Sequence, residues 1–329
     1  MGEESRIFSD ALEVLRRADI RMVSGSLDTM ELVLPDGRGV SAAVTVHRRP
    51  PTPSDLVGLR TATAEARRLL VVTPHATPHL RRLSSEGEVD VIGTDEDLVV
   101  VDGARYRVEG GAPRPVPAPT AARGRRPWVR WALERLLLFT RDPMTQRELA
   151  VLLGVSQQAV SLALRQSRHA RRTTGGWTAS SREDLLSEHL ADYPGAGGAT
   201  TYWYGVDEVI AQATAAVEFC RDQGVEVLLS GDAAADVYAP WRLPARAVLY
   251  VPEFVDLTAA GFAPATAEEH TLAIRVPADP TLWRTAAAAG KPVLLADPVI
   301  TAHDVRRSAG ADAHEAAERL LTAIREEAL

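Results

Sequence analysis

Four polar residues stand on one side of a predicted helix, and their side chains suit the recognition of base pairs in DNA. They are Gln157, Gln158, Ser161 and Arg165. A glutamine can bridge N6 and N7 of adenine, and an arginine can bridge O6 and N7 of guanine. Each such contact gives about 1–3 kcal/mol of discrimination between bases. Helices of this kind also serve protein contacts, so a helical hairpin that binds another protein is the alternative interpretation.

The chain from Gln146 to Arg165 has the pattern that would position these side chains, namely two short helices joined by a tight turn. A helix-turn-helix needs a small residue where its helices cross, a glycine in the turn and an apolar residue that holds the second helix against the first. These three positions are occupied by Ala150, Gly154 and Val160. The apolar side of both helices is completed by Leu149, Leu153, Val155 and Leu164.

Capping residues and flanking segments predict where these helices begin and what supports them. Thr145 is followed three residues later by Glu148, which is the pattern of a capping box, and Ser156 is the predicted N-cap of the second helix. A supporting helix is expected at Trp128–Phe139. After the second helix, extended residues flank the pair Gly175-Gly176, as in the β-wing of a winged helix. We therefore expect a winged helix-turn-helix.

Further residues of this segment suit the DNA backbone. Arg168, Arg171 and Arg172 lie at the predicted wing, where they are better placed for phosphates than for bases. The expected DNA-binding set is completed by residues at the starts of the two helices, which are Thr145, Gln146 and Ser156. The expected partner is double-stranded DNA.

The charge of the chain is unevenly distributed. The formal net charge is −7, yet the segment Arg114–Arg182 holds thirteen arginines and three acidic residues and so carries +10, which leaves −17 for the rest. A basic block within an acidic protein is typical of a nucleic-acid-binding module carried by domains that do not bind nucleic acid. A solvated arginine-rich linker would have the same composition, so the local helix-turn-helix pattern decides between them.

Length and composition exclude several classes of protein. At 329 residues the chain is expected to form two or three domains. The single cysteine, Cys220, excludes an internal disulfide framework and a cysteine-based zinc site. No apolar run approaches the roughly 20 residues that span a bilayer, and the N-terminus lacks a signal-peptide pattern. We therefore expect a cytoplasmic protein, associated with the nucleoid, that has no membrane partner.

The residues before the basic block predict a mixed α/β domain at 1–110. Helices are expected at Ile7–Arg17 and Pro78–Leu83. Strands are expected at Met30–Leu34, Val40–Val46, Leu69–Val72, Val89–Ile92, Leu98–Val101 and Tyr106–Val108. Residues 111–127 are rich in proline and arginine and have no hydrophobic periodicity, so a linker is expected there.

With these elements assigned, residues 128–329 resemble bacterial regulators related to the AbiEi antitoxins of type IV toxin–antitoxin systems. Besides the helix-turn-helix, the resemblance rests on Val227–Val251 (VLLSGDAAADVYAPWRLPARAVLYV) and on Leu294–Leu321. It implies a C-terminal α/β antitoxin domain at 183–329 and regulation of transcription by binding promoter DNA. No partner toxin is visible in the sequence, so a toxin partner does not follow from the resemblance.

Two fainter resemblances concern enzymes whose metal-binding acids this chain lacks. Val227–Val251 resembles a nucleotidyltransferase core, but its strand Ala247–Tyr250 carries no Asp-X-Asp pair to hold Mg²⁺. The N-terminal domain resembles the restriction-endonuclease-like fold, in which two acids bind Mg²⁺ and a lysine helps activate water. Here Glu31 is the candidate first acid, whereas Thr45 and His47 stand at the second acid and lysine positions. We expect a nuclease-like scaffold without catalysis, and a metal-dependent nuclease is the alternative.

Two groups of residues that include histidines are candidates for metal ligands. His75 and His79 have the spacing of ligands on one helical face, but the neighbouring prolines interrupt a helix there, so a pair in a loop is expected. Residues near the C-terminus are expected at the capped start and on the surface of the last helix, namely His303, Asp304, Asp312 and His314. No metal and no cofactor are expected.

These observations predict an α/β multidomain protein. Its expected parts are a restriction-endonuclease-like domain at 1–110, a Pro/Arg-rich linker at 111–127, a winged helix-turn-helix at 128–182 and an AbiEi-like, nucleotidyltransferase-like C-terminal domain at 183–329. The expected function is sequence-specific binding of double-stranded DNA by a bacterial transcriptional regulator that is not an enzyme. A homodimer is expected, because such proteins read two-fold sites. The alternatives are a DNA nuclease guided by the winged helix, and an antitoxin or scaffold that acts by protein contact.

Overall fold

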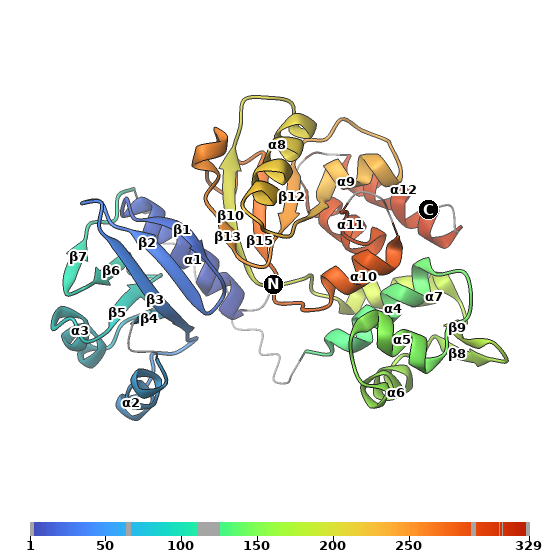
Figure 1. Cartoon of the computed structure of the whole chain (residues 1–329), viewed down its shortest axis with the longest axis horizontal. Helices are drawn as coiled ribbons and strands as arrows, with labels where there is room; N and C mark the ends of the chain where they lie inside the picture. The colour runs from blue at the N-terminus through green and yellow to red at the C-terminus, as the bar shows by residue number, and fades with distance from the viewer. Residues whose placement is uncertain are drawn as a thin grey trace. The chain divides into compact units, whose positions relative to one another are not determined.

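The computed structural model describes residues 3–63, 67–110, 126–290, 294–308, 310 and 312–326. The structure is mixed α/β, as expected, and its residues form two compact units (Figure 1). The first unit comprises the described residues within 1–121, 198–201 and 252–259, and the second comprises those within 122–197, 202–251 and 260–329. The predicted linker at 111–127 lies outside the described residues except for its last two positions.

The first unit is built on an eight-stranded sheet with the order β13-β1-β2-β3-β4-β5-β6-β7. Its elements are α1 (Glu3–Arg17), β1 (Arg21–Gly25), β2 (Thr29–Val33), β3 (Gly39–Val46), α2 (Pro53–Ala62), β4 (Arg68–Thr73), α3 (Pro78–Ser85), β5 (Asp90–Gly93), β6 (Leu98–Val101), β7 (Ala104–Tyr106) and β13 (Phe254–Val255). Strands β1 to β3 are antiparallel, β3 to β5 are parallel, and β5 to β7 are antiparallel again.

Helices cover the sheet of the first unit on both faces. The amphipathic helix α1 packs against β1, β3, β4, β5 and β6 through buried residues such as Phe8 and Leu15. On the other face, Leu56 of α2 and Leu80 of α3 share a hydrophobic cluster with Val71 of β4. Successive residues of β4 therefore point to opposite faces of the sheet, one covered by α1 and the other by α2 and α3.

Three elements of the first unit were not expected from the sequence, namely β1, α2 and β13. Strand β13 comes from far along the chain and pairs with β1 at the edge of the sheet, with Phe254 opposite Gly25 and its ring stacked on Phe8. The other helices and strands are confirmed with small changes of boundary, such as the start of α1 at Glu3 rather than Ile7, except the last strand. It was predicted at Tyr106–Val108, but β7 is Ala104–Tyr106 and shares only Tyr106 with that range.

The second unit combines a helical part with a five-stranded sheet of order β11-β12-β15-β10-β14. The helical part and its hairpin are α4 (Trp128–Phe139), α5 (Gln146–Leu153), α6 (Gln157–Gln166), β8 (Ala170–Thr173), β9 (Gly176–Ala179) and α7 (Arg182–Asp192). The remaining elements are β10 (Ala199–Tyr204), α8 (Val209–Asp222), β11 (Leu228–Ser230), α9 (Gly231–Tyr238), β12 (Ala247–Tyr250), β14 (Ala263–Pro264), β15 (Leu272–Val276), α10 (Leu282–Ala289), α11 (Pro298–Val305) and α12 (Ala313–Arg325). The first three residues of β10, and all but the last residue of the 3-10 helix η1 (Leu257–Ala260), are counted with the first unit.

The helical part shares one hydrophobic core with the C-terminal helices. Leu136 of α4, Leu149 of α5 and Val160 of α6 belong to the same buried cluster as Leu320 of α12 and Val299 of α11. Helix α10 packs against both α4 and α5. The segment with the helix-turn-helix pattern is thus integrated into the second unit, which was not expected from the sequence. None of the described helices combines the length and apolar character needed to cross a membrane.

Candidate nucleic-acid interface

Helices α5 and α6 are joined by the tight turn that the sequence predicts. Thr145 caps α5 by accepting from the backbone N–H of Glu148 at 3.2 Å, while the carboxylate of Glu148 accepts from the backbone N–H of Thr145 at 2.7 Å. The backbone N–H and the hydroxyl of Thr145 both donate to the Glu148 carboxylate and lower its pKa. Gly154 ends α5 with φ of 65°, a left-handed conformation that glycine adopts without strain. Ser156 then caps α6 by accepting from the backbone N–H of Ala159 at 3.2 Å.

Helix α6 presents the predicted polar residues on the side opposite to its buried residues. Val160, Ala163 and Leu164 are buried, whereas Gln157, Gln158 and Arg165 are exposed and Ser161 is half-buried. The guanidinium of Arg165 donates to Ser161 Oγ at 3.1 Å. This side also contains Leu162, which is half exposed and which the sequence analysis did not select.

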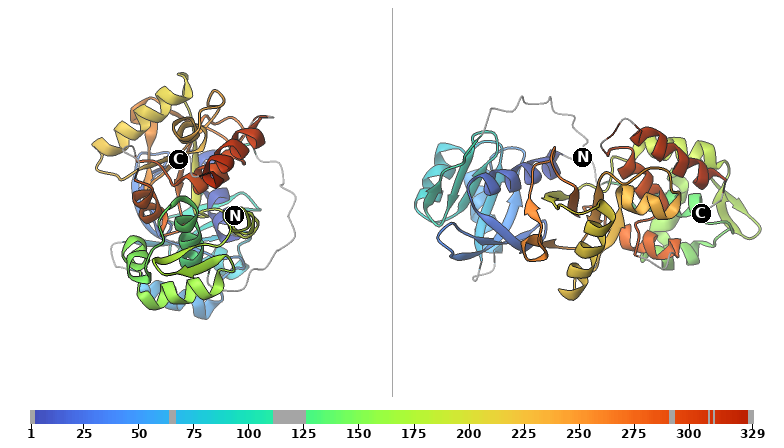
Figure 2. Two further views of the ribbon diagram at one scale, coloured as in Figure 1. Left: turned by 90° about the vertical axis from the view of Figure 1, so that its right-hand side faces the viewer. Right: turned by 90° about the horizontal axis from the view of Figure 1, so that it is seen from above.

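The expected wing is an antiparallel hairpin of β8 and β9, which projects from the helices (Figure 1; Figure 2, right). Met144, just before α5, adds to it, because its backbone exchanges hydrogen bonds of 2.9 and 2.7 Å with Trp177. The backbones of Met144 and the hairpin lie so close that only glycine fits at position 176. A Cβ there would lie 2.5 Å from the carbonyl of Met144. The start of α5 and the hairpin are thereby held together.

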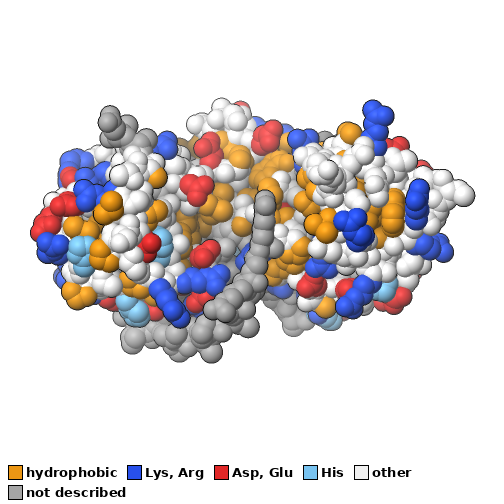
Figure 3. All heavy atoms as spheres, turned by 90° about the horizontal axis from the view of Figure 1, so that it is seen from below, with side chains coloured by type: hydrophobic (Ala, Val, Ile, Leu, Met, Phe, Trp, Pro, Cys, Tyr) orange, Lys and Arg blue, Asp and Glu red, His pale blue; other side chains and the backbone are white. Residues whose placement is uncertain are grey.

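A cleft of about 310 Å³ lies between the start of α5 and the hairpin. Its lining includes the predicted residues Thr145, Gln146 and Arg172. Arg171 and Arg172 are exposed on β8, and Arg168 is exposed between α6 and β8, with Glu188 3.8 Å away. Basic side chains stand at several places on the right-hand part of the surface viewed from the α6 side (Figure 3).

Not every arginine of the basic block is at the surface. Arg135 of α4 is completely buried, and Arg130 is mostly buried between Glu134 and Asp192. Arg182 donates to the backbone carbonyl of Thr140. The sequence count therefore overestimates the charge that the block can offer to a partner.

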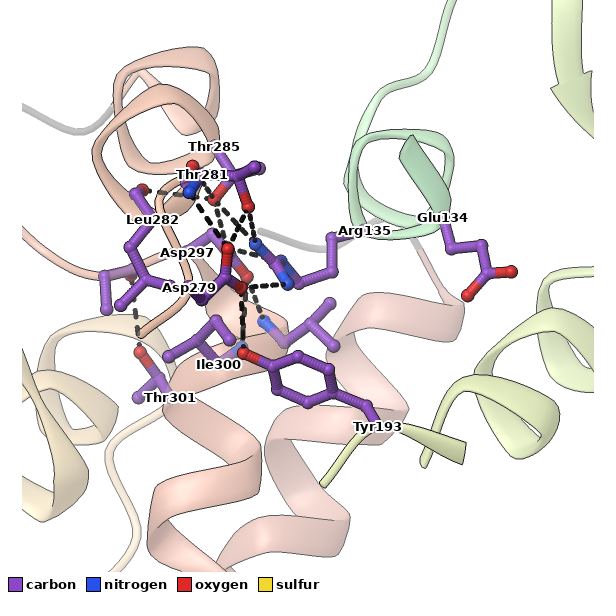
Figure 4. A network of polar contacts seen from close by, with 12 residues as sticks. Glu134, Arg135, Tyr193, Asp279, Thr281, Leu282, Thr285, Asp297, Ile300 and Thr301 are labelled. Atoms are coloured by element: carbon purple, nitrogen blue, oxygen red, sulfur yellow. Dashed lines mark hydrogen bonds and ion pairs between the residues drawn. The ribbon is translucent and has the colours of Figure 1, made fainter. Parts of the chain in front are cut away.

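Arg135 is the centre of a buried polar network that joins α4 to the C-terminal helices (Figure 4). Its Nε donates to Asp297 at 3.1 Å, its Nη1 donates to Asp279 at 3.3 Å, and its Nη2 donates to the hydroxyl of Thr281 at 3.0 Å. Asp297 also accepts from the hydroxyl of Thr285 and caps α11. Burial disfavours the charged guanidinium, but the two aspartates outweigh it and raise the pKa of Arg135 above its ordinary value.

A second buried pair adjoins this network. His189 of α7 contacts Glu134 of α4, with 3.1 Å between its Nδ1 and the carboxylate. The His189 ring is stacked on Tyr193, whose hydroxyl donates to Asp279. Burial lowers the pKa of His189 despite the opposing effect of Glu134.

The structure separates His303 and Asp304 from the other residues that were expected at the last helix. Both lie in α11 and are buried, so that expectation was wrong for them. Asp304 accepts from Ser230 at 2.7 Å, Tyr250 at 2.8 Å and Arg275 at 2.7 Å. Burial alone would raise the pKa of Asp304, but Arg275 and the hydrogen-bond donors hold it well below its ordinary value. The cluster has the character of a satisfied interior ion pair.

The candidate nuclease residues lie on one face of the first unit's sheet. Glu31 of β2 accepts from the hydroxyl of Ser41 at 2.6 Å. Thr45 Oγ1, on the neighbouring β3, and His47 Nε2, just after that strand, are buried and have no hydrogen-bond partner among the described residues. Burial lowers the pKa of His47. Within the described part of the chain, no group of three His, Cys, Asp or Glu residues is arranged to hold a metal ion.

Comparison of the chain with protein-family models, with curated proteins and with solved structures finds no significant match.

Proposed function

We propose that the protein binds double-stranded DNA sequence-specifically and acts as a bacterial transcriptional regulator of the AbiEi antitoxin type, without catalysis. The observation that carries this proposal is the exposed polar face of α6. Gln157, Gln158 and Arg165 are side chains that can each bridge two atoms of one base edge. They point away from a packed core, on a helix held by a cap and a glycine turn.

The elements around α6 support a winged helix-turn-helix. Three helices and an antiparallel hairpin follow one another in the order that this motif requires, and Met144 adds the short strand segment between the first two helices. A recognition helix in the major groove would leave the hairpin beside the DNA backbone. Arg171 and Arg172 on the hairpin would then contact phosphates, which position the protein without reading sequence. Leu162 would supply an apolar contact suited to a thymine methyl group.

The first unit fits a restriction-endonuclease-like scaffold that has lost its metal site. In support, its chain runs through a helix, three antiparallel strands, a helix and a parallel strand before the rest of the sheet. The candidate acid Glu31 is paired with Ser41 of β3, whose hydroxyl donates to it. Thr45 of β3 and His47, which follows β3, stand where the nuclease pattern needs an acid and a lysine. We assign this unit a role in dimerisation or DNA contact.

The experiment is a binding measurement on selected DNA. The purified protein selects duplexes from a random pool, and its affinity for the enriched duplex and for a scrambled duplex of equal composition is measured at about 50–300 mM salt, with and without Mg²⁺. A regulator prefers the selected duplex throughout this range, leaves it intact, and protects two half-sites about one helical turn apart. Equal and steeply salt-dependent binding to both duplexes would contradict sequence recognition. Cleavage that depends on Mg²⁺ would support the nuclease, and a co-purifying protein with weak DNA affinity would support the antitoxin or scaffold.

A further inference from the structure

Arg284 of α10 lies over the turn between α5 and α6, although it is far from the turn in the sequence. A Cβ built on Gly154 would lie 3.0 Å from Arg284 Nε and 3.1 Å from its Cζ. Helix α10 packs against both α4 and α5, which brings this side chain to the turn. Two residues after Gly154, Ser156 begins the cap of α6. The guanidinium is therefore close to the start of the helix that carries the predicted base-reading side chains.

The charge of Arg284 is not neutralised within the described part of the chain. The residue is exposed and forms no ion pair or hydrogen bond with any described residue. Two other arginines of the second unit are neutralised instead, since Arg242 pairs with Asp232 and Arg275 pairs with Asp304. An arginine that lies against a backbone turn without an acidic partner is free to bind an external anion.

The surroundings of Arg284 favour a phosphate over a base. The first N–H groups of a helix give its start a partial positive charge, which attracts anions. The base-reading side chains project from the exposed face of α6, whereas Arg284 lies at the turn that precedes this helix. In a helix-turn-helix bound to DNA the first helix crosses the sugar-phosphate backbone, so Arg284 beside the end of α5 would face phosphates.

The buried network around Arg135 holds helix α10, which carries Arg284. Its neighbour Thr285 donates to Asp297 at 2.7 Å and lies 3.4 Å from the guanidinium of Arg135. Arg135 belongs to α4, the helix that supports α5 and α6. The interior ion pairs thus hold α10 in a set orientation on the helical part, and the exposed residue beside them is held over the turn.

We propose that Arg284 binds a DNA phosphate beside the start of α6, so that the DNA interface includes a residue of the C-terminal α/β part as well as the helix-turn-helix. This inference rests on the proposed function and adds a positioning contact that the helix-turn-helix pattern does not contain. It also gives a reason for the hydrophobic core that the helix-turn-helix shares with the C-terminal helices. An arginine on α10 can position the DNA relative to α6 only if α10 does not move relative to α6.

The test compares Arg284→Ala with the wild-type protein on the selected and scrambled duplexes over a range of salt concentrations. Removing one phosphate contact should make the slope of log K against log salt shallower by about 0.9, which corresponds to about eightfold weaker binding at 0.1 M salt. The loss should be the same on both duplexes, because a phosphate carries no sequence information. In phosphate-ethylation interference, one position that inhibits the wild-type protein should no longer affect Arg284→Ala.

Arg221→Ala is the matched control, because Arg221 is an exposed arginine at the end of α8, a helix that packs on the sheet. It should bind both duplexes like the wild-type protein, and both variants should keep the wild-type melting temperature. An unchanged salt slope for Arg284→Ala, or an equal change for Arg221→Ala, would overturn the inference while leaving the proposed function intact. A loss confined to the selected duplex would also overturn it, because Arg284 would then read bases. If the wild-type protein binds neither duplex, the proposed function fails, and this inference fails with it.

Discussion

Replacing Arg135 with methionine should destabilise the second unit strongly. Methionine keeps much of the aliphatic stem but removes the cation that lies between Asp279 and Asp297, both of which are completely buried. Removing one partner of a buried ion pair costs about 3–5 kcal/mol, because the other charge is left uncompensated. Each aspartate retains other donors, namely a tyrosine or threonine hydroxyl and backbone N–H groups. We therefore expect the lower end of that range, about 3 kcal/mol.

Urea unfolding followed by tryptophan fluorescence measures this loss selectively, because all six tryptophans lie in the second unit. The midpoint should fall with an unchanged slope, which indicates a change in stability rather than in the surface exposed on unfolding. Arg221→Met is the control and should change the free energy of unfolding by less than about 0.5 kcal/mol. If Arg135→Met costs less than about 1 kcal/mol, the network does not hold the helical part against the C-terminal helices, and it does not hold α10 against α4 and α5.

Three further predictions concern stability. Burial holds the pKa of His189 below its unfolded value of about 6.5, so stability is full above that pH and falls as the pH is lowered through it. Below about pH 6.5, the free energy of unfolding should therefore depend less on pH in His189→Gln than in the wild-type protein, and equal slopes would contradict this. Gly154→Ala should cost about 1–2 kcal/mol in urea unfolding because of its left-handed backbone, and a neutral substitution would show that the turn relaxes. Ser156→Ala should cost about 1 kcal/mol through loss of the α6 cap, whereas no loss would mean that water replaces the cap.

The local elements of the helical part were predictable because their signals lie within a few residues of one another. The bounds of α4 match the prediction, and α5 and α6 begin after the predicted caps Thr145 and Ser156. A cap, a left-handed glycine and a buried stripe are each set by neighbouring residues. Sequence patterns therefore located the exposed side of α6 correctly, while its role in reading DNA stays a prediction.

Features that depend on distant residues could not be predicted in this way. Arg135 was counted with the basic block, but its partners Asp279 and Asp297 are contributed by a segment much later in the chain. Strand β13 joins the first unit's sheet through only two residues, which are too few to give a strand pattern. Asp304 was assigned to a helix surface because nothing near it in the sequence indicates Arg275, which neutralises it.

The central claim is that the exposed side of α6 reads base sequence, and the ratio of affinities for the selected and scrambled duplexes tests it most directly. Arg165→Ala should reduce this ratio by the equivalent of about 1–3 kcal/mol, because a contact to a base edge is lost. Arg171→Ala should weaken binding to both duplexes equally and make the salt slope shallower by about 0.9, which leaves the ratio unchanged. If Arg165→Ala instead weakens both duplexes to the same extent, α6 does not read sequence through this residue, and the account is contradicted.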